Sequence, residues 1–351
     1  MATINLLSKY APKLDERYHL GSLTDAACGT DYDWNGVNSI QVLSLFAPDL
    51  NDYDSSAAAN RFGTPSEVDD ELNVYTLNQK KSFSKTFDVT NVHDQGFLKK
   101  AVSYLKQAWD ESYVPAIDKY RFKTWANGAG LGTLNTTALT KSTIVEAILT
   151  AHAELDDAGV PSQNRFTFVR SDLVVKFKLA DEFKGDGALM TKFVIRNNRG
   201  MVNDGPMISV PKFMFPKGVN FIVKYKKASA DPMKMRLLRA NDNAPGYAGT
   251  LMEGLVRYDS FVIAHKADGI YVHSASDKAT NPTITITDSS AAITAGAGES
   301  IKYTVDGTNP KTSETAEAYS DSFDVTVGQH IRAYAYKAGI INSAVVSKDV
   351  E

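Results

Sequence analysis

Residues 93–127, HDQGFLKKAVSYLKQAWDESYVPAIDKYRFKTWAN, decide the fold of this chain. Apolar residues recur here every three to four positions, which is the period of one helix face: Phe97, Ala101, Leu105, Trp109, Tyr113, Ile117 and Tyr120. The charged residues between them predict a solvated opposite face: Lys99, Lys100, Lys106, Asp110, Glu111, Asp118 and Lys119. Asp94 is placed to cap the start, and Gly128 and Gly130 end the pattern.

The pattern therefore predicts one long helix within residues 91–129, a rod of about 50 Å. Pro115 lies inside it and removes a backbone hydrogen bond, so we expect a kink there. A rod of this length serves as a spine on which other elements pack.

Composition bounds the class of protein. The 351 residues are 43% hydrophobic and 10% aromatic, enough for a real core and for two or three domains. A net charge of -3 excludes a global basic field for nucleic acid or anionic membrane. The single Cys28 excludes an intrachain disulfide and a multi-cysteine zinc site.

No apolar run reaches the roughly 20 residues of a membrane span, and residues 1–21 lack the apolar core of a signal peptide. We expect a soluble protein made in a cytoplasm.

The part before the helix divides in two. Residues 1–33 are weakly periodic and predict an arm that orders against another subunit or domain. Residues 34–90 contain strand-like runs at 37–46, 72–78 and 81–89. Ala47 to Asp70 between them is rich in Asp, Ala, Ser and Asn, and predicts a long loop that projects from the body.

Residues 130–273 have a mixed α+β pattern. A helix is predicted at 142–159, with Ser142 or Thr143 at its cap and Gly159 at its end. Residues 172–183 also show helical spacing. Strands are predicted at 165–170, 208–213, 219–225 and 264–272.

Composition changes near residue 274. From Ser276 onward there is no Leu, Met or Trp, and ten acidic against six basic residues give a local charge of -4. Short β-branched runs alternate with turn residues, which predicts a small all-β sandwich over residues 274–351. Its predicted strands cover 283–287, 301–305, 323–327, 331–336 and 344–350.

Motifs that might carry chemistry all have structural explanations. His152-Ala-Glu154 matches the first half of a zinc deaminase signature, but the second half needs two cysteines, and the chain has only Cys28, which lies far upstream. Gly128-Ala-Gly-Leu-Gly132 follows a helix instead of a strand, so we interpret it as a helix end and loop. The six histidines are scattered without ligand spacing. We expect no catalytic residue, no cofactor-binding residue, no metal ligand and no enzymatic activity.

Two groups of lysines stand out. They are Lys80, Lys81 and Lys85, and Lys224, Lys226 and Lys227. Either group could face nucleic acid, but solvated strand faces are the simpler interpretation.

The order of these features resembles the major capsid proteins of tailed double-stranded DNA phages, which share the Hong Kong 97 fold. The matching pieces are the arm ending near Ser22, the strand and loop up to Asp52-Tyr53, Val74-Tyr-Thr-Leu with Lys81-Ser-Phe, Asp88, Val114-Pro-Ala-Ile-Asp-Lys-Tyr120, Leu155 to Val169, Pro245-Gly-Tyr-Ala-Gly249, Glu253-Gly254, Tyr258-Asp-Ser-Phe261 and Lys266 to Tyr271. The resemblance rests on their order and spacing. It covers residues 1 to about 273, and no cross-linking residue of that family can be located by a motif.

The last segment has a likeness of its own. Tyr303-Thr-Val-Asp-Gly-Thr-Asn-Pro-Lys-Thr with Tyr319 is similar to the pattern of immunoglobulin-like domains related to the chitobiase C-terminal module. Asp-Gly-Thr and Pro also make a tight turn, which is the structural explanation of the motif.

These resemblances imply an α+β Hong Kong 97-like fold with a C-terminal immunoglobulin-like sandwich. Its parts would be an N-terminal arm (1–33), an extended loop with flanking strands (34–90), a spine helix in the peripheral domain (91–129), an axial domain with the remaining peripheral strands (130–273) and the sandwich (274–351).

The implied function is a structural one, assembly into the icosahedral head that encloses the phage genome. Expected partners are other copies in hexamers and pentamers, portal and scaffolding proteins, and packaged double-stranded DNA contacted weakly. The acidic C-terminal domain is expected on the outer surface, where it could contact glycans or the host. The protein would reside in the virion after assembly in the host cytoplasm.

Two other functions remain open at this point. One is an encapsulin-like nanocompartment shell with the same fold. The other is a carbohydrate-binding or adhesion protein that acts through its last domain.

Overall fold

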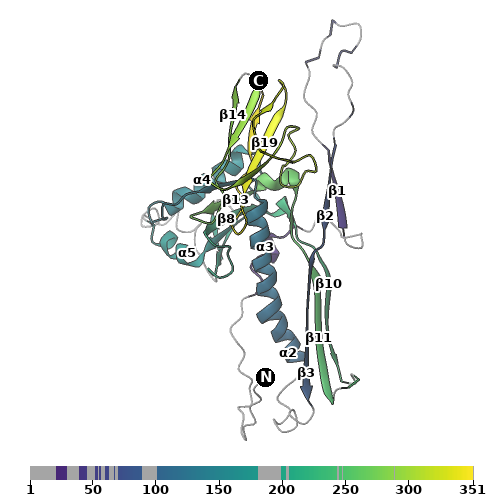
Figure 1. The fold of residues 1–351 in the computed structure, drawn as a ribbon. Coiled ribbons are helices and arrows are strands. Elements are labelled where there is room, and N and C mark those ends of the chain that lie inside the picture. The colour runs from purple at the N-terminus through teal and green to yellow at the C-terminus, as the bar shows by residue number, and fades with distance from the viewer. Residues whose placement is uncertain are drawn as a thin grey trace.

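A computed structural model describes residues 21–29, 39–45, 70–88, 101–180, 199–202, 205–242, 248–287 and 289–350, with a few further positions between 52 and 67 and at 245–246. The rod predicted from the sequence runs through the middle of the molecule (Figure 1). The predicted cap Asp94, the weakly periodic first residues and most of the loop 47–70 lie outside the described residues.

Three consecutive pieces make up the rod. They are α2 (Ala101–Ala108), a π-helical turn η2 (Trp109–Tyr113) and α3 (Val114–Gly128). Pro115 lies in the first turn of α3, where a missing N–H is best tolerated. A kink was expected at Pro115, and the irregularity in the described rod is the π-helical turn immediately before it. As predicted, the helix ends at Gly128, where a Cβ would collide with Val262.

Side chains on two faces of a mixed sheet form the main core. In the described part of the chain its order is β4 (Leu131–Leu134), β13 (Ile270–Ser274), β8 (Val219–Tyr225), β5 (Arg165–Arg170), β7 (Gly205–Val210) and β6 (Arg199–Val202). Helices α4 (Ile144–Asp157) and α5 (Ser171–Lys178) cover one face through residues such as Ile148 and Phe177. The other face packs on α3 through Phe122 and Trp125. The helix predicted at 142–159 and the strands predicted at 165–170 and 219–225 are confirmed.

One strand prediction in this region is half wrong. Residues 264–272 were expected to be extended, but Ala264–Gly269 form a 3-10 helix (η5), and only the following residues join the sheet. Ala264, Ala267 and Gly269 are buried, and a Cβ on Gly269 would press on Ala228. These small residues recur at helical spacing, which lets the 3-10 helix pack closely. A search for the alternation of a β-strand does not detect such spacing.

A long sheet packs along the lower half of the rod. Its order is β10 (Met233–Asn241), β11 (Gly249–Tyr258) and β3 (Gln79–Asp88), all antiparallel. Phe83, Leu238, Val256 and Tyr258 contact Tyr113 and Ile117. Gly254 is required because a Cβ there would collide with the Phe83 ring.

Two smaller strand pairs complete the body. β1 (Ser39–Leu45) and β2 (Asp70–Thr76) pair antiparallel in full register, and β9 (Ser229–Ala230) pairs with β12 (Phe261–Val262). The strands predicted on both sides of the polar loop are therefore present, and they pair with each other.

Two facing sheets form the C-terminal part. One contains β14 (Thr283–Thr287), β15 (Ser290–Thr294) and β18 (Phe323–Asp324). The other contains β17 (Glu317–Ala318), β16 (Ser300–Thr304), β19 (His330–Tyr336) and β20 (Val346–Asp349). Ile284, Ile293, Ile301 and Ile331 fill the space between them. Strands β15 and β17 were not predicted.

Candidate functional site: contacts of the rod with the N-terminal segment and the C-terminal domain

The motif at His152 has a structural role. His152 is 1% exposed, and its Nε2 lies 3.1 Å from Thr167 Oγ1 on β5. Burial, followed by the nearby Arg165, lowers the pKa of His152 to about 4. Within the described ranges, no three His, Cys, Asp or Glu side chains come together to hold a metal, and no helix is long and apolar enough to cross a bilayer.

The glycine-rich run after the rod serves packing. A Cβ on Gly130 would collide with Asp268, and its N–H donates to Ala267 O at 2.8 Å. Gly132 has φ +148° and lies against Val272. Here the chain enters β4 in close contact with β13, which leaves no cradle for a phosphate.

Lys224 corrects one interpretation of the lysine groups. We expected a solvated strand face, but Lys224 is completely buried, whereas Lys227 is exposed. The Lys224 Nζ donates to Ala27 O at 2.6 Å and lies 4.6 Å from the centre of the Trp125 ring. Burial lowers its pKa to about 8. Lys224 therefore binds the N-terminal segment to the sheet and is not available to a ligand.

Asp118 corrects a second interpretation. It was placed on the solvated face of the helix but is fully buried. Its carboxylate accepts hydrogen bonds from Ser22 Oγ and Leu23 N at 2.9 Å each and from Thr24 Oγ1 at 2.5 Å. One turn later, Arg121 pairs with Asp25 at 2.5 Å. These charge-assisted bonds attach residues 22–25 to α3.

A lysine of the C-terminal domain caps the end of the rod. Lys311 Nζ donates to Ala129 O at 2.6 Å and to Asn127 O at 3.1 Å. Carbonyls at a helix C-terminus lack partners within the helix and carry partial negative charge, which favours a cation there. Burial and the nearby Lys278 lower the pKa of Lys311 to about 7.

Further bonds hold the domain on the body. Asn309 Nδ2 donates to Ala264 O at 3.2 Å, Asn281 Nδ2 donates to Gly132 O at 3.1 Å, and Val345 N donates to Gly130 O at 2.9 Å. The domain is therefore docked along the end of α3 and the start of β4.

Asp306 organises the turn that precedes Lys311. It accepts hydrogen bonds from the N–H and hydroxyl of Thr308 and from the hydroxyl of Thr315. These bonds contribute to a lowered pKa of Asp306, although burial opposes them. The Asp-Gly-Thr-Asn-Pro-Lys motif thus makes a tight turn that directs Asn309 and Lys311 at the body.

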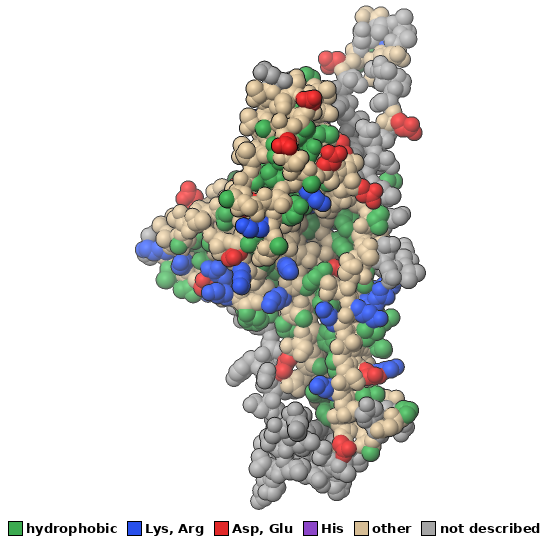
Figure 2. Space-filling model, viewed as in Figure 1, with side chains coloured by type: hydrophobic (Ala, Val, Ile, Leu, Met, Phe, Trp, Pro, Cys, Tyr) green, Lys and Arg blue, Asp and Glu red, His purple; other side chains and the backbone are tan. Residues whose placement is uncertain are grey.

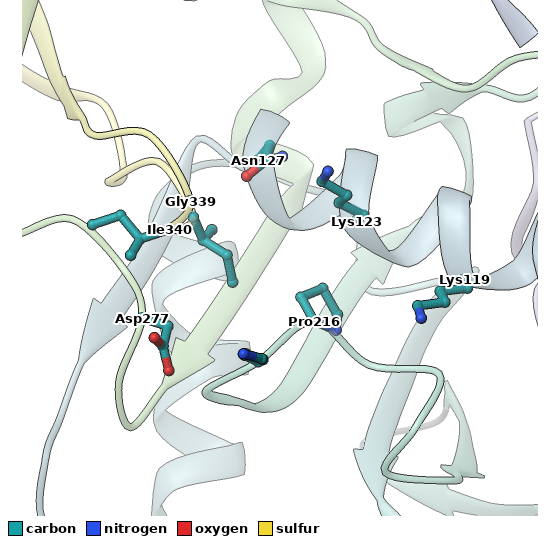
Figure 3. A pocket seen from close by; sticks show the side chains of 9 residues that line it. Lys119, Lys123, Asn127, Pro216, Asp277, Gly339 and Ile340 are labelled. Carbon is teal, nitrogen blue, oxygen red and sulfur yellow. The ribbon is translucent and has the colours of Figure 1, made fainter.

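A cleft of about 380 Å³ lies beside this docking contact. Figure 3 shows Lys119, Lys123 and Asn127 on successive turns of α3, facing Pro216 and Asp277. Lys217 and residues 339–341 complete the lining.

Exposed apolar side chains occur on β10 and among the few described residues between 52 and 67. Met233, Met235 and Leu237 on β10 are each 40–43% exposed. In the polar loop, Tyr53 and Phe62 are exposed, and their ring centroids lie 5.0 Å apart. Such groups suit several modest contacts with other molecules.

Comparison with solved structures places this architecture. A structure of Mycobacterium phage Che8 matches with a TM-score of 0.61 at 15% identity, over 78% of this chain and 99% of that one. The mature capsid of bacteriophage PhiM1 matches with a TM-score of 0.58 at 11% identity, over 76% of this chain and 91% of that one. The capsid of cyanophage P-SCSP1u matches with a TM-score of 0.57 at 13% identity, over 76% of this chain and 92% of that one.

The chain shares its fold with phage capsid structures. Residues 274–347 also match the family model of the chitobiase/beta-hexosaminidase C-terminal domain, as the Tyr303 motif indicated. Among curated proteins, none matches the chain.

Sequence reasoning missed the residues that form these contacts. Asp118 and Arg121 lie one turn apart within the long helix pattern, and a charged pair at a buried position is not visible in periodicity. Lys311 lay within the recognised motif from Tyr303 to Thr312, but that motif was interpreted as a tight turn and not as a contact with the end of the helix.

Proposed function

We propose that this protein is the major capsid protein of a tailed double-stranded DNA phage, with the Hong Kong 97 fold and a structural rather than catalytic role. The observation that carries the proposal is the fold likeness, because the matched phage chains are covered almost completely, at 91–99%. Fold alone does not fix function. The exposed apolar side chains on β10 and at Tyr53 and Phe62 support a role in assembly.

In this proposal the segments have distinct tasks. Residues 1–33 are the arm, 34–90 the extended loop with its strands, 91–129 the spine helix, 130–273 the axial domain with the remaining peripheral strands, and 274–351 the immunoglobulin-like domain. The anchoring of residues 22–24 by Asp118 and of Asp25 by Arg121 supports an arm that leaves the body at a fixed point. Each contact is modest, and closure of a shell adds many of them.

The proposed partners follow from that role. Copies of the chain form hexamers and pentamers in the virion, after assembly with portal and scaffolding proteins in the host cytoplasm. The shell encloses double-stranded DNA. The C-terminal domain faces outward, and the family match supports weak contact with glycans, which a glycan array on the full chain tests directly.

Deleting the arm tests the assembly mechanism. The full chain and a variant lacking residues 1–20 are expressed in parallel, and particles are examined by negative-stain electron microscopy. Because the anchor at residues 22–25 is kept, the variant should fold but form fewer or incomplete shells. Equal shell formation by both proteins would refute a role of the arm in assembly.

A further inference from the structure

The cleft between α3 and the C-terminal domain has an unusual balance of charge. Lys119 and Lys123 are exposed and one turn apart on α3, and Lys217 extends from the turn before β8. Among the described residues of the lining, Asp277 is the single carboxylate. Three ammonium groups against one carboxylate leave an excess of positive charge in a chain whose net charge is -3.

The wall opposite α3 is held rigidly. A Cβ on Gly218, which has φ +78°, would collide with Ser276, and Ala275 N donates to Gly218 O at 2.7 Å. Lys217 therefore lies in a turn packed against the connection to the C-terminal domain. Ile341 N donates to Asp277 O at 2.8 Å, which brings residues 339–341 to the same wall. The cleft exists only when the C-terminal domain is docked.

We propose that this cleft binds phosphate groups of the DNA backbone, and that the α3 face carrying it points toward the packaged genome. Lysine side chains bind phosphodiesters as flexible point charges without reading sequence. The open form of the cleft and its position on a long helix suit a backbone that passes along the surface. This inference rests on the proposed function, since it is the enclosed DNA that supplies the phosphates.

The distribution of charge over the visible face agrees with this orientation. Lys and Arg side chains lie across the middle of the face, from the side of α5 over α3 to the long sheet, and several acidic side chains lie over the C-terminal domain (Figure 2). DNA would be attracted to the first region and repelled by the second. On this face the DNA backbone would therefore lie over the basic middle and not over the acidic strands.

Binding of a short fluorescent DNA duplex tests the site in the full chain. Fluorescence anisotropy is recorded from about 50 to about 200 mM salt, a range in which phosphate contacts weaken strongly. K119E/K123E should weaken binding and lower the slope of log affinity against log salt by about 2. The control K141E/K178E changes the charge equally on exposed residues outside the cleft lining, and should keep most of the affinity.

Asp277→Asn gives a test of opposite sign. Asp277 has φ +54°, which asparagine also tolerates, so the backbone is preserved while the only carboxylate of the cleft is removed. Its DNA affinity should rise. Equal weakening by K119E/K123E and K141E/K178E, or no gain in Asp277→Asn, would overturn the inference.

A final experiment distinguishes DNA from free phosphate as the ligand of the cleft. Inorganic phosphate is titrated by calorimetry into the wild-type chain and K119E/K123E. Saturable binding lost in the variant, with DNA affinity unchanged, would assign the cleft to a free anion and overturn the DNA assignment. Electron microscopy of the same variant separates this outcome from the proposed function: shells that form normally leave the capsid role intact even when the cleft fails.

Discussion

Lys311 joins two parts of the chain that are about 180 residues apart, through its bonds to the carbonyls of Asn127 and Ala129. Lys311→Met keeps most of the aliphatic chain and removes both bonds, which leaves the two carbonyls at the helix end without this partner. We expect the free energy of unfolding to fall by about 1–3 kcal/mol. Urea denaturation measures it, with the exposed Lys337→Met as control, expected within about 0.5 kcal/mol of wild type. Equal stability of both variants would show that Lys311 does not hold the domain.

Two buried histidines predict destabilisation in acid. The pKa values of His152 and His273 are each lowered to about 4, mainly by burial, against 6.5 for an exposed histidine. Between pH 6.5 and 4 the unfolded chain binds more protons than the native one, so stability falls as pH falls. The slope is at most about 1.4 kcal/mol per pH unit for each histidine. His152→Asn should lower the slope of the free energy of unfolding against pH between pH 4 and 6.5, by up to the contribution of one proton. Urea denaturation at several pH values measures this slope, and an unchanged slope would contradict the assignment.

Single residues also show where sequence reasoning ended. The helix period correctly placed Ile117 and Trp109 on the face of the rod that packs against other elements, but it assigned the buried Asp118 to the solvated face. The burial of Asp118 depends on hydroxyl and amide donors from residues 22–24, and that of Lys224 on the carbonyl of Ala27. Such partners are distant in sequence, so no local pattern reveals them.

Among the elements, the long sheet is held to the rod by aromatic contacts. The Arg236 guanidinium lies 3.6 Å from the centre of the Trp109 ring, which stacks on Tyr113. Trp109→Ala removes a cation–π contact and apolar packing, and should cost about 2–4 kcal/mol. Amide hydrogen exchange should speed up in β10 and β11. Val102→Ala is the matched control, since Val102 is 77% exposed on the same rod. Unchanged exchange in Trp109→Ala would mean that the sheet is held by other contacts.

Elements with clear periodicity were predicted best. The end of the rod, α4, β5 and β8 follow their apolar patterns closely, whereas β10 and β11 were not predicted as strands. Nearly every residue of β10 is exposed, so it has no buried face to produce alternation. β11 pairs with β3, which lies about 170 residues earlier in the chain. β11 does alternate in burial from Met252 to Tyr258, but Gly254 lies on the buried face and Leu251 and Leu255 on the other, so the hydrophobic pattern does not show the alternation.

At the scale of the whole molecule, charge is divided between the parts. The last 76 residues carry -4 and the rest +1, which together give the net -3. The matched phage structures extend over 76–78% of this chain. The fold class could be inferred from the order of sequence features, but the docking of the C-terminal domain could not, because it depends on a few polar bonds between distant turns.

The central claim is that copies of this chain close into a shell. Purified full-length protein, imaged by electron microscopy across protein concentrations, salt and crowding agents, tests it most directly. The account predicts closed icosahedral particles, or uniform hexameric and pentameric rings that close when a scaffolding protein is added. Monomers that stay dispersed under every condition, with or without scaffold, would contradict it.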